Sequence, residues 1–117
     1  MKYISLNHNS APTSFRNAVI NGLAPDKGLY FPEEEIFLSK KLLESLYEIE
    51  EIELCYEVIK DFIGDEIPKN RLIDIIANTI SFEIPVKEIE SSIYSLELFH
   101  GPTLAFKDVG AKFMALC

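Results

Sequence analysis

Hydrophobic residues in the middle of the chain recur with the period of an α-helix. The clearest helix is predicted over residues 52–64, where apolar positions repeat at intervals of three and four residues and Gly64 ends the pattern. Ser14 and Ser39 precede two shorter patterns and are predicted N-caps, because a serine hydroxyl accepts a hydrogen bond from a free first-turn N–H. The four predicted helices of this region are residues 15–23, 40–49, 52–64 and 68–80. The residues predicted to be buried on the second and fourth are Leu42, Leu43, Leu46 and Tyr47, then Leu72, Ile73, Ile76, Ala77 and Ile80.

Extended segments are predicted at both ends of the helical block. Residues 2–6 and 29–31 favour short strands, and the turn between residues 24 and 28 places Pro25 at its first corner and Gly28 at a position of positive φ. After Pro85 two alternating runs, "VKEIE" and "IYSLELF", predict a hairpin that turns at Ser91-Ser92. The chain is therefore of mixed α+β class. We place the domain boundary so that residues 1–85 form one domain and residues 86–117 begin another.

Composition and charge narrow the classes of partner. Nineteen acidic residues against 11 basic ones give a formal charge of −8, which argues against a nucleic-acid partner. Cys55 and Cys117 lie far apart in helical patterns, and together with two histidines they form no metal-ligand spacing. The chain has no apolar stretch long enough to span a membrane and no signal-peptide pattern at its start. We expect a cytoplasmic protein that binds no metal.

The most unusual residue is a lysine in the apolar segment "TLAFKDVGAKFMALC". A helix capped by Thr103 would place Lys107 on one face with Gly110, Ala111 and Met114, and this face is expected to be buried within a larger body. Desolvation and the positive end of the helix dipole both favour a neutral amine, which is a nucleophile suited to an aldehyde. The structural alternative is that Lys107 extends its ammonium to water, as most lysines in apolar helices do.

The residues around this lysine resemble a known family. The stretch "SLELFHGPTLAFKDVGAKFMA" resembles the segment of threonine synthases whose lysine holds pyridoxal phosphate. Upstream, "SFRNAVINGLAPDKGLYFPE" and "DFIGDEIPKNRL" resemble the N-terminal region of the same family, in the same order. The resemblance covers essentially the whole chain and rests on several separate motifs.

The resemblance implies a fold, a cofactor and a reaction. It implies a small N-terminal domain of helices and strands that leads into the first edge of an α/β fold of type II pyridoxal-phosphate enzymes. It implies that Lys107 is catalytic and binds pyridoxal 5'-phosphate, and that the enzyme is a carbon–oxygen lyase acting on phosphate. The substrate would be O-phosphohomoserine, converted with water to threonine and phosphate.

For three residues near Lys107 the sequence allows two roles each. Thr103 either lines the cofactor pocket or only caps the helix, and His100 either faces the pocket or ends the strand. Asp108 is interpreted as a first-turn carboxylate that complements the helix N-terminus rather than as an acid–base group, and an ion pair with Lys112 is expected.

The length departs from the family pattern. The five glycines are scattered and form no loop for a cofactor phosphate, and residues for a substrate phosphate are not recognisable. We therefore expect an N-terminal fragment that is inactive alone and that self-associates through its apolar C-terminal helix. The alternatives are another type II enzyme, such as a threonine dehydratase or a cysteine synthase, and a noncatalytic interaction module.

Overall fold

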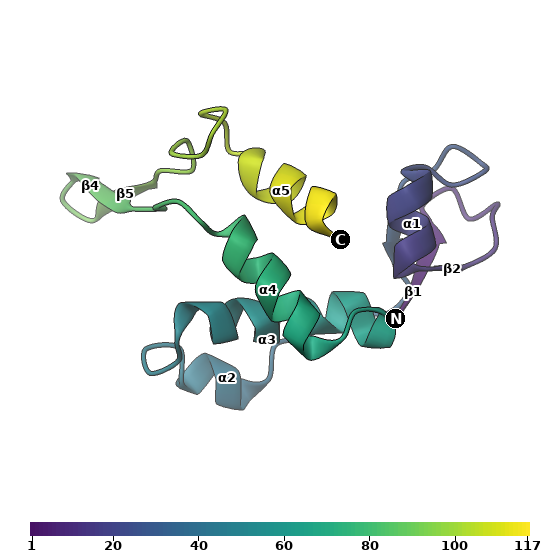
Figure 1. The fold of residues 1–117 in the computed structure, drawn as a ribbon, viewed down its shortest axis with the longest axis horizontal. Helices are drawn as coiled ribbons and strands as arrows, with labels where there is room; N and C mark the ends of the chain where they lie inside the picture. Colours follow the sequence, from purple (N-terminus) through teal and green to yellow (C-terminus); the bar gives the residue numbers. More distant parts are fainter. The chain divides into compact units, whose positions relative to one another are not determined.

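The computed structural model describes residues 1–117 and contains two compact units, Met1–Ile73 and Asp74–Cys117. Figure 1 shows the chain coloured along its sequence, with mixed helices and strands in both parts. Helix α4 (Lys69–Thr79) contains the division between the two units. None of the helices combines the length and the apolar character needed to cross a lipid bilayer.

The first unit is built on a small antiparallel sheet. Strand β1 (Lys2–Ser5) lies in the centre, between β2 (Thr13–Ser14) and β3 (Tyr30–Pro32). The strands predicted near residues 2–6 and 29–31 are confirmed. Strand β2 was not predicted, because two residues are too few to show an alternating pattern of apolar and polar positions. The side chain of Tyr3 turns inward, and its hydroxyl donates to the carbonyl oxygen of Phe62 at 2.7 Å. This bond joins the sheet to the end of helix α3 (Glu51–Ile63).

Helix α1 (Phe15–Asn21) receives two caps at its start, one local and one distant. The predicted cap is confirmed: Ser14 Oγ accepts from the N–H of Asn17 at 3.2 Å. The second cap is the carboxylate of Glu66, which accepts from the N–H groups of Phe15 at 2.8 Å and Arg16 at 3.0 Å. Because a helix leaves its first N–H groups without partners, a carboxylate at this place stabilises it.

The turn after α1 differs from its prediction. Lys27, not Gly28, adopts the left-handed conformation, with φ of 65°. Gly28 is required for another reason: a Cβ at this position would lie 3.0 Å from the backbone nitrogen of Asn7 and would overlap the hydroxyl of Ser5. The glycine therefore allows close packing of the turn against β1 rather than a positive φ.

The helices of the middle of the chain are confirmed as elements but not in every boundary or face. Helix α2 (Lys40–Glu44) is capped by Ser39 as predicted, but it ends five residues earlier than expected, and of its predicted apolar stripe only Leu42 is buried. Helix α3 ends at Gly64, whose φ is 64°, as predicted. It continues into a short 3-10 helix, η1 (Gly64–Glu66). The buried residues of α4 are Leu72, Ile75, Ile76 and Thr79. The buried face is therefore rotated relative to the predicted one, and Ala77, which was predicted to be buried, is exposed.

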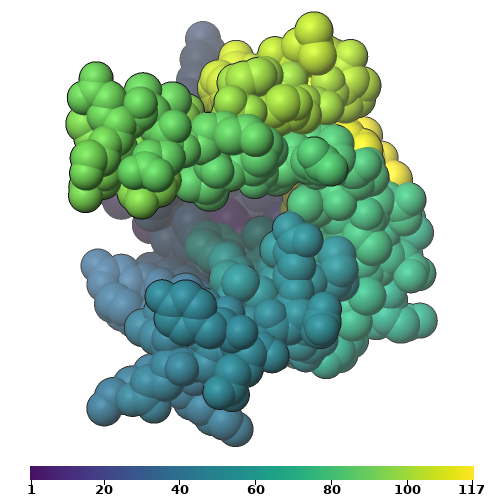
Figure 2. Space-filling view, turned by 90° about the vertical axis from the view of Figure 1, so that its left-hand side faces the viewer, coloured from purple at the N-terminus to yellow at the C-terminus, as the bar shows by residue number.

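The second unit contains the predicted hairpin and a final helix. Strands β4 (Val86–Glu90) and β5 (Ile93–Leu96) pair antiparallel, with Ser92 in a left-handed conformation at the turn. Their apolar side chains are largely exposed, and the hairpin is the green part of the chain in Figure 2. Helix α5 (Asp108–Leu116) ends the chain. The mixed α+β class expected from the sequence is confirmed.

Candidate functional site

The segment that carries the candidate lysine is a set of tight turns followed by α5. The expectation of a helix from Thr103 is wrong: residues 101–107 form turns, and Leu104 has φ of 57°, which a helix does not allow. Lys107 occupies the N-cap position, and its carbonyl oxygen accepts from the N–H of Ala111 at 2.9 Å. Proline and glycine in "HGPT" predict a turn at residues 100–103, but in the structure the turns continue through Lys107.

The first helical residue, Asp108, holds these turns together. Its carboxylate accepts two hydrogen bonds from Thr103, one from the backbone N–H at 2.9 Å and one from the hydroxyl. The N–H of Asp108 donates to the carbonyl of Ala105 at 3.0 Å. Only 5% of Asp108 is exposed. Thr103 is therefore not the helix cap, and its own side chain is instead bound by the residue that starts the helix.

Several contacts keep the buried carboxylate ionised. The hydroxyl of Thr103 is the largest influence that lowers the pKa of Asp108, and backbone N–H groups and the charge of Lys112 act in the same direction, against the effect of burial. The predicted ion pair does not form as a direct contact: the ammonium of Lys112 donates to Ser81 Oγ and lies 5.7 Å from the ring centroid of Phe82. Lys112 thus joins α5 to the segment after α4.

Lys107 lines a shallow hollow on the surface of α5. The hollow has a volume of about 540 Å³ and is lined by Phe106, Lys107, Gly110, Ala111 and Met114. The predicted shared face of Lys107, Gly110, Ala111 and Met114 is therefore present. Lys107, Gly110 and Met114 are exposed in this chain, so the burial of this face within a larger body stays a prediction. The periodicity identified an apolar face but not what covers it.

The chemistry of the hollow suits a flat ring that reacts with an amine. Apart from the ammonium of Lys107 its lining is apolar, and the lysine Nζ lies 6.0 Å from the ring centroid of Phe106. A Cβ placed on Gly110 would meet no atom within 4 Å. The backbone of α5 one turn beyond Lys107 therefore borders open space. The residues present fit a planar aldehyde cofactor bound through Lys107.

The candidate histidine is engaged elsewhere. His100 Nε2 lies 2.8 Å from Glu97 Oε2, and its ring stacks on Phe99 with centroids 4.8 Å apart. His100 is not among the residues that line the hollow of Lys107. Of the two roles considered for it, these contacts favour the structural one.

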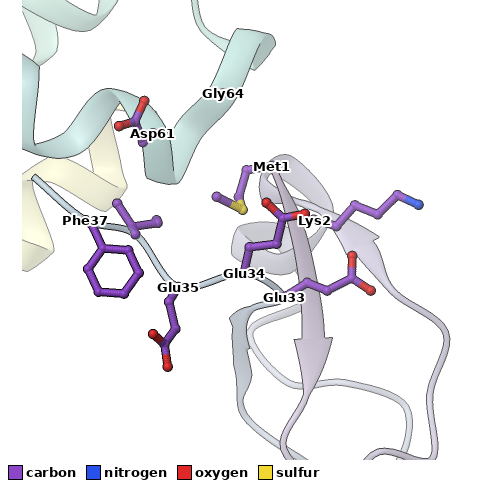
Figure 3. A pocket seen from close by; sticks show the side chains of 9 residues that line it. Met1, Lys2, Glu33, Glu34, Glu35, Phe37, Asp61 and Gly64 are labelled. Carbon is purple, nitrogen blue, oxygen red and sulfur yellow. The ribbon is translucent and has the colours of Figure 1, made fainter. Parts of the chain in front are cut away.

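A second hollow, which the sequence did not indicate, lies in the first unit. It has a volume of about 630 Å³, and its lining residues are Met1, Lys2, Glu33, Glu34, Glu35, Ile36, Phe37, Asp61 and Gly64. Figure 3 shows these side chains coming from the N-terminal strand, from the segment after β3 and from the end of α3. Its lining carries four carboxylates against the two positive charges of Lys2 and the Met1 amino group, so its net charge is negative and disfavours an anion. No group of three or more His, Cys, Asp or Glu side chains in the chain is placed to hold a metal ion.

Comparison with known proteins identifies the class of protein that has this fold. Residues 2–80 match a family described as "Threonine synthase N terminus". The chain is similar to solved structures of threonine synthase from Escherichia coli, with 38% identity and a TM-score of 0.92, and of PLP-bound threonine synthase from Brucella melitensis, with 33% identity and a TM-score of 0.93. Each likeness covers 99% of this chain, and 27% and 26% of the two structures. The class of structure that the chain matches is thus the N-terminal region of threonine synthases.

Curated relatives lead to the particular family. The chain is 38% identical to threonine synthase of Escherichia coli over 115 residues and 41% identical to that of Buchnera aphidicola over 116 residues. The chain belongs to the threonine synthase family. It spans about a quarter of the length of these relatives, 27% in both, while 98% of the chain is matched.

Proposed function

We propose that the protein carrying this chain is a threonine synthase, a carbon–oxygen lyase that converts O-phosphohomoserine and water to threonine and phosphate. The observation that carries the proposal is the agreement in fold with two threonine synthases over 99% of the chain, combined with a lysine that lines an open apolar hollow at the start of α5. The threonine synthase from Brucella melitensis is a PLP-bound structure. We propose the same cofactor, pyridoxal 5'-phosphate, for this protein.

The residues of this chain would perform a defined part of the reaction. When bound, pyridoxal phosphate supplies an electron sink for charge that develops on the substrate carbons. Lys107 would hold the cofactor through its ε-amine and, once released by the amine of the substrate, take and return protons at those carbons. Gly110 and Ala111 leave room for the ring, and Phe106 and Met114 exclude water from one side of it. Thr103 stays a predicted cofactor-site residue; its hydroxyl hydrogen is donated to Asp108.

The rest of the site is proposed to lie outside this chain. The relatives are about four times as long as the segment matched, and none of the residues around Lys107 forms a phosphate-binding loop. The acidic hollow of the first unit does not suit a phosphorylated ligand, because its carboxylates repel phosphate. The 117 residues alone are therefore expected to have negligible activity on O-phosphohomoserine.

Three further features complete the proposal. Residues 1–85 form the N-terminal domain and residues 86–117 begin the cofactor-binding domain, which agrees with a family match that ends at residue 80. The protein acts in the cytoplasm, where a soluble amino-acid biosynthetic enzyme meets its substrate. The isolated chain self-associates through α5, where Met114 is exposed together with the neighbouring Phe106.

The test is to trap the cofactor in the complete protein encoded by the reading frame that contains this chain. Pyridoxal phosphate is added, the adduct is reduced with borohydride, and the labelled peptide is identified by mass spectrometry. We expect the label on Lys107 and turnover of O-phosphohomoserine. Lys107→Ala should abolish both, while Lys87→Ala, which removes an exposed lysine of β4, should leave both intact.

Different failures have different meanings. A label on another lysine would refute the role of Lys107. Labelling of Lys107 without turnover of O-phosphohomoserine, but with turnover of threonine or O-acetylserine, would favour a threonine dehydratase or a cysteine synthase. A complete protein that takes no label would favour the noncatalytic module.

A further inference from the structure

The carboxylate of Asp108 is the most constrained polar group of the second unit. It is buried, and both of its oxygens accept from Thr103. Gly101 packs closely against this side chain, because a Cβ added at Gly101 would overlap the carboxylate and lie 2.8 Å from the Cβ of Asp108. Burial of a carboxylate is unfavourable unless hydrogen bonds within the protein replace those to water. A buried carboxylate of this kind is therefore expected where the loop that it holds has a role.

These contacts close a loop whose last residue before the helix is Lys107. The loop runs from Thr103 to Asp108 and contains Leu104 in a left-handed conformation that a leucine does not favour. On the other side, the carbonyl of Lys107 is held by the N–H of Ala111 at 2.9 Å. The backbone of Lys107 is therefore held from both directions.

The side chain of Lys107, by contrast, has no polar partner of its own in the structure. Its neighbour is the ring of Phe106, whose centroid is 6.0 Å from Nζ, and the residue is exposed. The backbone of Lys107 therefore fixes the point from which the side chain starts, and no polar contact within the chain holds the amine further. Both oxygens of Asp108 are occupied by Thr103, so the carboxylate is bound to the loop rather than to the lysine ammonium.

We propose that Asp108 is a positioning residue for Lys107: its two hydrogen bonds to Thr103 hold the loop so that the lysine amine enters the hollow formed with Gly110, Ala111 and Met114. The inference rests on the proposed function, because it assumes that Lys107 binds the cofactor. Asp108 itself touches neither the hollow nor the amine, and it acts through Thr103 and the loop. The lowered pKa of the carboxyl supports this role, since an ionised carboxylate offers both oxygens as acceptors at neutral pH.

The test compares four variants of the complete protein with the unsubstituted protein. Asp108→Asn keeps the shape but turns one acceptor into a donor, and Thr103→Val removes only the hydroxyl. Thr103→Ser is the conservative variant that retains the hydroxyl. Asp74→Asn makes the same chemical change as Asp108→Asn on α4, away from the loop, and is the matched control.

Three measurements separate positioning from loss of folding. Hydrogen exchange at the Thr103 amide in the cofactor-free protein reports the loop directly. Borohydride trapping gives the rate and extent of labelling at Lys107, and kcat is expressed per labelled site. We expect faster exchange at Thr103 and slower trapping in Asp108→Asn, with kcat lower by about 100-fold, since a displacement of about 1 Å in a reacting group has an effect of that size. KM should change far less, because substrate contacts are left in place.

The remaining outcomes decide the inference. Thr103→Val should show a smaller loss in the same direction, Thr103→Ser should recover trapping relative to it, and Asp74→Asn should behave as the unsubstituted protein. If kcat per labelled site and the trapping rate are the same in all variants, Asp108 has only a structural role and the inference is overturned. If the unsubstituted protein carries no label on Lys107, the proposed function itself fails, and the two failures are thereby distinguished.

Discussion

Two aspartates of this chain organise loops by accepting several hydrogen bonds each. Asp108 binds Thr103 beside the candidate lysine, and Asp26 plays the corresponding part in the first unit. The carboxylate of Asp26 accepts from the hydroxyl of Ser5 at 2.6 Å and from the N–H groups of Asn9 at 2.9 Å and Gly28 at 3.0 Å. A single carboxylate thus joins β1, the loop after it and the turn before β3.

The first prediction concerns the pH dependence of Asp26. The hydroxyl of Ser5 and then the N–H groups of Gly28 and Asn9 lower the pKa of Asp26 below its ordinary value of 3.8. Because the folded pKa is depressed, the contribution of Asp26 to stability is complete above the unfolded value and is lost as the pH falls through the folded one. Asp26→Asn should therefore be less stable than the unsubstituted protein at pH 7, and the difference should shrink at acid pH.

This prediction is checked by urea unfolding of the two proteins at several pH values down to the acid limit of folding. Asp65→Asn, an exposed aspartate of η1, is the control and should show a much smaller effect at pH 7. A stability difference between the proteins that stays constant with pH would contradict the assignment to the carboxylate charge.

At the scale of elements, α5 contains a glycine that lowers the stability of the helix and that the proposed cofactor site would explain. Gly110 lies within the helix, where a glycine is unfavourable, and no atom of the chain would obstruct a side chain there. Nothing in the packing of the chain requires this glycine. Gly110 lines the hollow together with Lys107, and under the proposed function a ring bound by the lysine would approach the helix backbone there.

The second prediction is that Gly110→Ala has opposite effects on folding and on cofactor binding. The 117-residue chain should gain up to about 1 kcal/mol in free energy of unfolding, because alanine favours a helix over glycine by that amount. In the complete protein the added methyl should slow trapping of pyridoxal phosphate on Lys107. Chemical unfolding and borohydride trapping measure the two effects, and Gly22→Ala is the contrast: it should destabilise, because Gly22 has φ of 68°.

At the scale of the whole molecule, the chain exposes more apolar surface near its end than a self-sufficient domain would. Leu104 is 74% exposed, Phe106 65% and Met114 62%. The hairpin adds Val86, Ile89 and Tyr94, each more than 60% exposed. Since the relatives are about four times longer, the proposal of a larger α/β body around Lys107 accounts for this surface.

The third prediction is that the isolated chain self-associates, because apolar surface that lacks a cover is removed from water when two copies meet. Sedimentation equilibrium under reducing conditions, which exclude a disulfide through the exposed Cys117, should show a mass that rises with concentration. Met114→Lys should weaken the association, while Lys41→Met, far along the chain on α2, should not. A monomer at every concentration would refute the prediction.

The sequence alone determined the features that depend on neighbours within a turn or two. Ser14, Ser39 and Gly64 were assigned as caps because a hydroxyl or a missing Cβ acts on the adjacent helical turn, and the hairpin followed from alternation on both sides of Ser91-Ser92. The candidate lysine was singled out by its place in an apolar segment, and the resemblance to a family segment then suggested its role. That Gly110 and Ala111 share its face followed from the helical period.

Only the tertiary structure decided contacts between residues that the chain brings back together. Glu66 caps a helix that starts 51 residues earlier, and the need for glycine at position 28 comes from Ser5 rather than from φ. The start of α5 was misplaced because local apolar periodicity does not reveal that Asp108 turns back to bind Thr103. Periodicity reports which side of an element avoids water, whereas the closing of a loop depends on distances that only the folded backbone defines.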